Sequence, residues 1–367
     1  MLLPVGGLIV VALCGLFLFG LATTRVGVAA VAMGVVAALV PVVVVVAGFL
    51  WVDRWEPEPA KLLLLAFAWG ACIATITALA INSGAEAVGD LLLGSGHGSK
   101  ISALVSAPLV EEAAKDAFVL LIFWRRSAEF DGIVDGIVYA GFSAAGFAFT
   151  ENIYYFGRAF AEYGFGNGAN SGVLAAFFLR GVLSPFTHPL FAVMAGIGFG
   201  VAARTQQRWL RVVAPLTGYV AGVLLHALWN SSATLGGSKA FLTVYFLIMV
   251  PLFVGVVYVI VLQRRREQRI VAAALPKMVE RRWIAPSEVD LLSSLSGRRA
   301  WRRQARRESG RDAARAVGLY QASVTELAFL RRNRIRTDED RHRQDELLHT
   351  LKTARADAVR LAAGGAG

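Results

Sequence analysis

The sequence predicts an all-α, polytopic membrane protein with about eight transmembrane helices and a basic, helical cytoplasmic tail. Hydrophobic residues make up 56% of the 367 residues, and the mean hydropathy is +0.57, whereas soluble domains are only about 45 to 50% apolar. Apolar runs of about 18 residues or more, each able to cross about 30 Å of hydrocarbon, recur through the first 262 residues. The following segment, 263–367, is rich in Arg and Ala with apolar residues at helical spacing.

Eight apolar runs are long enough to be transmembrane helices. They are Leu2–Leu21, Val26–Val52, Lys61–Ile81, Ala103–Trp124, Gly132–Phe156, Leu179–Ala203, Leu210–Ser231 and Ala240–Leu262. The Gly- and Ser-containing segment Asn82–Ser102, between the third and fourth runs, is predicted to be an outer loop. Pro189 removes one helical hydrogen bond from the sixth run and therefore predicts a kink beside His188.

The distribution of basic residues predicts the orientation. Of the 37 Lys and Arg residues, 24 lie in 263–367, together with 13 of the 26 Asp and Glu residues, so this tail accounts for the whole net charge of +11. The positive-inside rule places the tail in the cytoplasm, and an even number of spans places the N-terminus there as well. We therefore predict a multi-pass cell-membrane protein with a transmembrane domain, 1–262, and a basic cytoplasmic tail, 263–367.

The same tail predicts a lipid partner. Basic residues close to a bilayer contribute about 1 kcal/mol each of attraction to anionic lipid. No nucleic-acid-binding motif accompanies the arginines, so a nucleic-acid partner is not expected.

Four ionisable residues interrupt the fourth apolar run, at Glu111, Glu112, Lys115 and Asp116. Each costs about 2.5 to 3.5 kcal/mol near the centre of a bilayer, so such residues face protein or water and commonly mark a functional site. Glu111 and Lys115 lie one turn apart on one helix face, while Glu112 is rotated by about 100° from Glu111. One carboxylate can therefore pair with the lysine while the other points elsewhere.

Further polar residues occur in the fifth, sixth and seventh runs. Glu151 and His188 each interrupt an apolar run, and His226 lies one turn before Asn230. At about 1.5 Å per residue, the glutamates and histidines all fall about 8 to 14 Å below the outer membrane edge. Two readings follow: the residues converge on one water-activating or metal-binding site, or each pairs across helices for stability alone.

These residues resemble the motifs of the PrsW family of intramembrane metalloproteases over about residues 50 to 235. The resemblance is carried by Glu111-Glu112-x-x-Lys115, Phe147-x-x-x-Glu151-Asn152, His188, His226-x-x-x-Asn230 and Asp53-Arg54-x-Glu56-Pro57-Glu58-Pro59. It implies site-1-type cleavage of membrane-anchored proteins such as anti-sigma factors. The chain is also similar, more distantly, to the CAAX prenyl endopeptidase and abortive-infection superfamily, in which a histidine occupies the position of Glu151.

Peptide hydrolysis needs an activated water, a donor to the developing oxyanion and a proton for the leaving amine. We predict that Glu111 or Glu112 activates the water, with Lys115 holding one of the two ionised. The resemblance and the ligand inventory together imply a Zn²⁺ ion held by Glu151, His188 and His226, and Asn230 could donate to the oxyanion. Because no HExxH motif is present, a metal-free alternative stays open. In it, Glu112 and Glu151 position the water, and His226 with Asn230 forms the oxyanion hole.

Two other functions would also place ionisable residues inside a membrane. A proton- or ion-coupled transporter is one, although the spans show no inverted repeat and the polar residues cluster in one half of the membrane. A catalytically silent receptor whose cytoplasmic tail binds a partner is the other.

Overall fold

The computed structural model describes residues 2–55, 57–126, 130–166, 172–332 and 338–364. All regular elements in these ranges are helices, which confirms the all-α prediction. The chain divides into two compact units. The first comprises Met1–Asp53 and Glu58–Tyr258, and the second comprises Arg54–Pro57 and Val259–Gly367. Arg54–Pro57 thus belongs to the second unit, which the composition of the chain did not predict.

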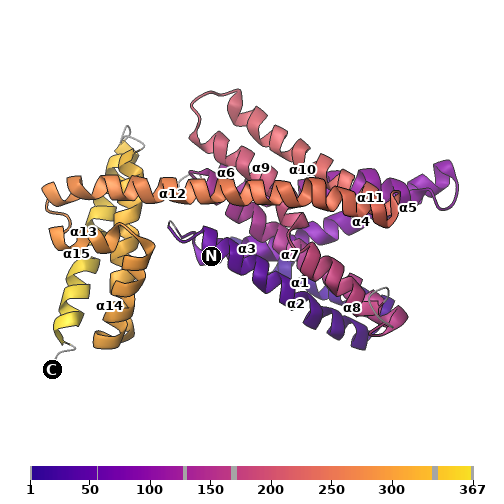
Figure 1. The fold of residues 1–367 in the computed structure, drawn as a ribbon, viewed down its shortest axis with the longest axis horizontal. Helices are drawn as coiled ribbons and strands as arrows, with labels where there is room; N and C mark the ends of the chain where they lie inside the picture. Colours follow the sequence, from indigo (N-terminus) through magenta and orange to yellow (C-terminus); the bar gives the residue numbers. More distant parts are fainter. Residues whose placement is uncertain (1, 56, 127–129, 167–171, 333–337, 365–367) are drawn as a thin grey trace. The chain divides into compact units, whose positions relative to one another are not determined.

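The first unit contains the apolar helices (Figure 1). They are α1 (Leu2–Val26), α2 (Val28–Val52), α3 (Ala60–Ala68), the π-helix η1 (Trp69–Ala74), α4 (Thr75–Leu93), α5 (Gly98–Ile101), the π-helix η2 (Ser102–Ser106), α6 (Ala107–Arg125), α7 (Ile133–Tyr163), α8 (Gly172–Ala176), the π-helix η3 (Phe177–Leu183), α9 (Thr187–Arg204), α10 (Leu210–Thr234), α11 (Gly237–Val244), the π-helix η4 (Tyr245–Met249) and the start of α12 (Val250–Glu280).

Seven helical segments in the described part of the chain are long and apolar enough to cross a membrane, as expected of a polytopic membrane protein. They match seven of the eight predicted spans. The remaining one contains α6, which is helical but carries Glu111, Glu112, Lys115 and Asp116, so its composition alone does not qualify it. The count of eight and the cytoplasmic location of both termini stay predictions.

Helix α7 is the centre of the first unit, where it packs against α2, α3, η1 and α9. Glycines let the backbones approach closely. A Cβ on Gly136 of α7 would lie 2.0 Å from the carbonyl oxygen of Gly196 in α9, and one on Gly70 of η1 would lie 1.8 Å from that of Ser143 in α7. These small-residue contacts, which are typical of helix packing in membranes, fix the position of α7, which carries Glu151, against α9, which carries His188.

The prediction of a loop over Asn82–Ser102 is wrong. Helix α4 continues to Leu93 and ends at Gly94, whose φ of 92° suits glycine. The turn that follows is held by Asp90, whose Oδ1 accepts hydrogen bonds from the backbone N–H groups of Gly96 and Gly98 at 2.9 and 2.8 Å. The Gly and Ser content suggested a loop, whereas the Ala, Glu and Leu residues among them sustain the helix.

A kink was predicted at Pro189, but the helix is interrupted completely just before it. The π-helix η3 ends at Leu183, and α9 begins at Thr187. Pro189 therefore lies in the first turn of α9, where a backbone N–H has no helical partner and a proline costs nothing. The break places His188 at the very start of α9.

The second unit is a helical domain with its own core. It contains the end of α12, the short 3₁₀ element η5 (Pro286–Glu288), α13 (Val289–Leu292), α14 (Leu295–Arg332) and α15 (Asp338–Gly364). Helices α14 and α15 pack along each other (Figure 1). Trp55, only 3% exposed, is part of this core beside Leu275 and Leu327. The guanidinium of Arg298 stacks over the Trp55 ring at 5.0 Å from its centre.

Asp53 and Glu58, which precede and follow Arg54–Pro57 in the sequence, belong to the first unit. The backbone N–H of Glu58 donates to both carboxylate oxygens of Asp53, at 3.1 and 3.2 Å, and the hydroxyl of Tyr139 donates to Glu58 Oε2 at 2.6 Å. Burial raises the pKa of Asp53 to about 7. Glu56, part of the same motif, lies outside the described residues.

Candidate active site

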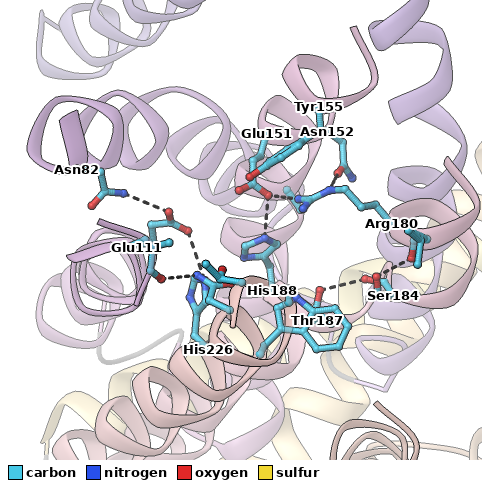
Figure 2. Close-up of a pocket in the computed structure, with 18 of the residues that line it drawn as sticks. Asn82, Glu111, Glu151, Asn152, Tyr155, Arg180, Ser184, Thr187, His188 and His226 are labelled. Atoms are coloured by element: carbon cyan, nitrogen blue, oxygen red, sulfur yellow. Dashed lines mark hydrogen bonds and ion pairs between the residues drawn. The ribbon is translucent and has the colours of Figure 1, made fainter. Parts of the chain in front are cut away.

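A cavity of about 490 Å³ lies among the helices of the first unit (Figure 2). Its polar lining comes from α4, α5, η2, α6, α7, η3, α9 and α10 and from the turn between η3 and α9. The ionisable and amide side chains that line it are Asn82, Glu86, Glu111, Glu151, Asn152, Arg180, His188, His226 and Asn230. The first unit therefore contains a polar cavity, large enough for several water molecules, between helices that are otherwise apolar.

Three buried side chains from three different helices converge on this cavity: Glu111 of α6, His188 of α9 and His226 of α10. One potential ligand atom from each lies within 4.8 Å of the others. Glu111 Oε2 is 3.9 Å from His226 Nε2 and has no hydrogen-bond partner among the described residues. Glu111 Oε1 accepts a hydrogen bond of 3.3 Å from the amide nitrogen of Asn82. One oxygen is thus held in place while the other is left for a ligand.

Glu112 lies behind the cavity and does not line it. Its side chain is fully buried, and Oε1 accepts hydrogen bonds of 2.7 Å from both Lys115 Nζ and His226 Nδ1. A carboxylate paired with a lysine accepts hydrogen bonds only, so Nδ1 of His226 is the donor, and Nε2 is the ring nitrogen that faces Glu111. Lys115 is also fully buried, and its Nζ lies 3.4 Å from His188 Nδ1. The Glu112–Lys115 ion pair therefore orients both histidines, His226 through Glu112 and His188 through Lys115.

Glu151 occupies the opposite wall of the cavity, between a cation and an imidazole. Its Oε2 forms an ion pair with Arg180 Nη2 and lies 2.9 Å from His188 Nε2. Arg180 also donates from Nε to Asn152 Oδ1 at 2.8 Å, and its guanidinium stacks over the ring of Tyr155 at 4.0 Å from the ring centre. Figure 2 shows these side chains gathered around Arg180. This network compensates the charge of Glu151 and holds it against His188.

The structure brings most of the predicted site residues to one cavity. Glu111, Glu151, His188, His226 and Asn230 line it, whereas Glu112 and Lys115 contact the histidines from behind. The metal-ligand geometry groups the two histidines with Glu111, while the predicted ligand Glu151 is paired with Arg180. The Asn230 amide donates to the carbonyl oxygen of Ala103 at 2.8 Å. The roles assigned to these residues stay predictions.

Arg180, Asn152 and Asn82 belong to the site but were not predicted as site residues. Arg180 could have been found, because it is a lone cation in the apolar stretch Phe177–Leu183, and such a residue in a membrane span needs an acidic partner. Asn152 follows Glu151 directly and was named only within the family motif. Asn82 was assigned to a loop, and only its position on α4 brings it to Glu111.

The donor set fits a catalytic metal ion. Two imidazoles and one carboxylate, with a further position open to water, form one of the common ligand sets of catalytic zinc. The partnerless Glu111 Oε2 supports this fit, since an uncompensated buried carboxylate oxygen is otherwise costly. The Glu112–His226 hydrogen bond is the kind of second carboxylate contact that orients a metal-binding histidine.

Comparison with known proteins gives one consistent result. Residues 58–256 match the model of the family described as PrsW family intramembrane metalloprotease. The chain is 28% identical over 213 residues to Protease PrsW of Geobacillus kaustophilus, a match covering 53% of this chain and 86% of that protein. It is 31% identical over 158 residues to Protease PrsW of Oceanobacillus iheyensis, covering 43% of this chain and 65% of that protein. No solved structure matches the chain.

Proposed function

The chain belongs to the PrsW family of intramembrane metalloproteases and is a membrane protease, and on this premise we propose that it hydrolyses a peptide bond of membrane-anchored proteins in the cavity lined by Glu111, Glu151, His188 and His226. The observation that carries the proposal is the convergence of these carboxylates and imidazoles from four helices on one space. Anti-sigma-factor-like proteins with a single membrane span are the proposed substrates.

We assign the metal to Glu111, His188 and His226. A metal ion there would take one ring nitrogen of His188 in place of its contact with Glu151 or with Lys115. A zinc ion there would polarise a water molecule and the carbonyl group of the substrate. This assignment exchanges the two carboxylates relative to the prediction from sequence. It is supported by the free Oε2 of Glu111 and by the pairing of Glu151 with Arg180.

Glu151 is then the proton acceptor. Both of its strong contacts, to Arg180 and to His188, use Oε2. Oε1 is therefore the oxygen that takes the proton from the attacking water. The water oxygen bonds to the carbonyl carbon, the carbon–nitrogen bond breaks, and Glu151 returns the proton to the leaving amine.

The remaining residues position these groups. Glu112 and Lys115 hold the rings of His226 and His188 in orientation, as their buried hydrogen bonds suggest. The amide of Asn230 has two N–H groups, of which one satisfies Ala103. The second is available to donate to the oxyanion, as predicted from the sequence.

We also propose that both termini are cytoplasmic and that the basic tail contacts anionic lipid. The support is the excess of Lys and Arg over Asp and Glu in 263–367. This orientation would place the cavity toward the outer half of the bilayer.

The proposed activity is tested by co-expressing the protein with a library of tagged single-span proteins. Wild type and Glu162→Gln, which alters an exposed carboxylate paired with Arg158, should produce the same fragments. Glu111→Gln and Glu151→Gln should produce none. Equal fragment yields from Glu111→Gln would refute the proposal. If instead proton flux through liposomes depends on Glu111 while no reporter is cleaved, the transporter reading is favoured.

The metal assignment has a separate test. Elemental analysis of purified protein should find stoichiometric metal in wild type and Glu151→Gln, and strongly reduced metal in Glu111→Gln and His226→Ala. Full activity in protein shown to be free of metal would defeat the assignment and favour the metal-free alternative.

A further inference from the structure

A second hollow of the first unit, of about 340 Å³, lies between α1, η1, α4 and α7. We call it the α1 groove. Its lining is almost wholly apolar and includes Leu18, Phe19, Ala22, Ala71, Leu79, Phe149 and Ile153. The volume lies within the range of about 300 to 1,000 Å³ that is typical of ligand pockets. The α1 groove is therefore large enough to hold several apolar side chains of a bound molecule.

Glu151 lines both the α1 groove and the reaction cavity. Successive residues of a helix are rotated by about 100°, so α7 presents two neighbouring faces here. Thr150, Ile153 and Tyr154 line the groove, whereas Asn152 and Tyr155 line the cavity. Glu151 lies at the edge between the two faces. A chain lying in the α1 groove would therefore reach the carboxylate that we assign as the proton acceptor.

The walls of the α1 groove suit an apolar segment. Two of its hydroxyl groups are already used: Thr150 Oγ1 donates to the carbonyl of Ala71 at 2.7 Å, and Thr75 Oγ1 donates to that of Gly70 at 2.9 Å. Glu151 and the exposed Arg25, in the last turn of α1, are its charged residues. A polar ligand would leave its own hydrogen-bonding groups unpaired along such walls, which is costly.

We propose that the α1 groove binds the apolar transmembrane segment of the substrate next to the peptide bond that is cleaved. This inference rests on the proposed function, since a protease acting on single-span proteins must hold an apolar segment beside its reaction cavity. Glu151 lines both the α1 groove and the reaction cavity, so a chain in the groove lies beside the site of hydrolysis. This continuity is the reason for choosing the substrate as the molecule that occupies the groove. One wall, α1, lies outside residues 58–256, which match the family. Helix α1, which lies outside the matched region, would thus contribute to the selection of substrates.

The proposal is tested by substitutions that fill the α1 groove with a larger side chain. Leu18→Trp and Ala22→Trp add bulk to its lining, and Leu16→Trp adds the same bulk to α1 at a side chain that is 69% exposed and does not line the groove. Two substrates are compared in detergent: a tagged single-span reporter cleaved by the wild type, and a short fluorogenic peptide spanning only its cleavage site. We expect kcat/KM for the reporter to fall at least about tenfold in the two groove variants, which corresponds to about 1.4 kcal/mol. Cleavage of the short peptide, and all activity of Leu16→Trp, should stay unchanged.

Loss of both activities in a groove variant that melts like wild type would overturn the proposal, as would cleavage of the reporter at the wild-type rate. If the wild type cleaves no reporter at all, the proposed function itself fails, so the two failures are distinguishable.

A second measurement does not depend on turnover. Cys72 lines the α1 groove, and Cys14→Ala with Glu111→Gln leaves it as the sole cysteine of an inactive protein. Reporters carrying one cysteine at successive positions are oxidised together with this protein. Disulfides should form with a few positions of the membrane segment next to the cleavage site and with none farther along. A groove occupied by lipid would give no disulfide at any position, and that result would overturn the proposal.

Discussion

Replacing Lys115 by methionine should destabilise the first unit strongly. Lys115 and Glu112 are both fully buried and form an ion pair at 2.7 Å. Glu112 Oε2 already has no hydrogen-bond partner, so Lys115→Met would leave the carboxylate with His226 alone. Removing one partner of a buried ion pair costs about 3 to 5 kcal/mol. For a unit of about 250 residues, each kcal/mol lowers Tm by about 2 to 4 °C, so a fall of about 6 to 20 °C is expected.

Thermal unfolding in detergent, followed by tryptophan fluorescence at pH 7, measures this effect. Arg158→Met is the matched control, because it breaks an exposed ion pair of the same 2.7 Å length that contributes less than about 1 kcal/mol. The double variant Glu112→Gln/Lys115→Met removes both charges and should recover most of the lost stability. A single variant that melts within about 2 °C of wild type, or a double variant no more stable than Lys115→Met, would refute the argument that charge compensation at Glu112 stabilises the unit.

Three further outcomes are expected. Gly136→Ala should reduce both Tm and activity, because its Cβ would meet the Gly196 carbonyl at 2.0 Å, whereas Gly48→Ala, with open space around it, should change neither. Trp55→Ala should destabilise the second unit by about 3 to 5 kcal/mol, seen as faster hydrogen exchange around Leu275, while the exposed Trp124 can be replaced without this effect. Burial raises the pKa of Asp53 to about 7, so the folded protein binds this proton more tightly than the unfolded chain does. The free energy of unfolding of the wild type should therefore fall, relative to that of Asp53→Asn, as pH rises from about 4 to 7. If Tm changes with pH by the same amount in the two proteins over that range, this interpretation is wrong.

The order of the apolar runs and the charges within them determined a good deal without any tertiary information. Ionisable residues cannot face lipid, so Glu111, Glu151, His188 and His226 had to point toward protein or water, whatever the packing. The depth estimate then placed them in one layer. The membrane class, the helical fold and the candidate residues of the site follow from these two constraints.

Which side chain meets which was decided only by the rotation and packing of the helices. Adjacent residues such as Glu111 and Glu112 differ by about 100° around the helix axis, and the sequence does not say which of them faces the cavity. The structure turns Glu111 into the cavity and Glu112 against Lys115 and His226. Arg180, 29 residues after Glu151, reaches it because η3 packs against α8, which packs against α7. Such pairings depend on contacts between remote residues, which the local pattern of the chain does not encode.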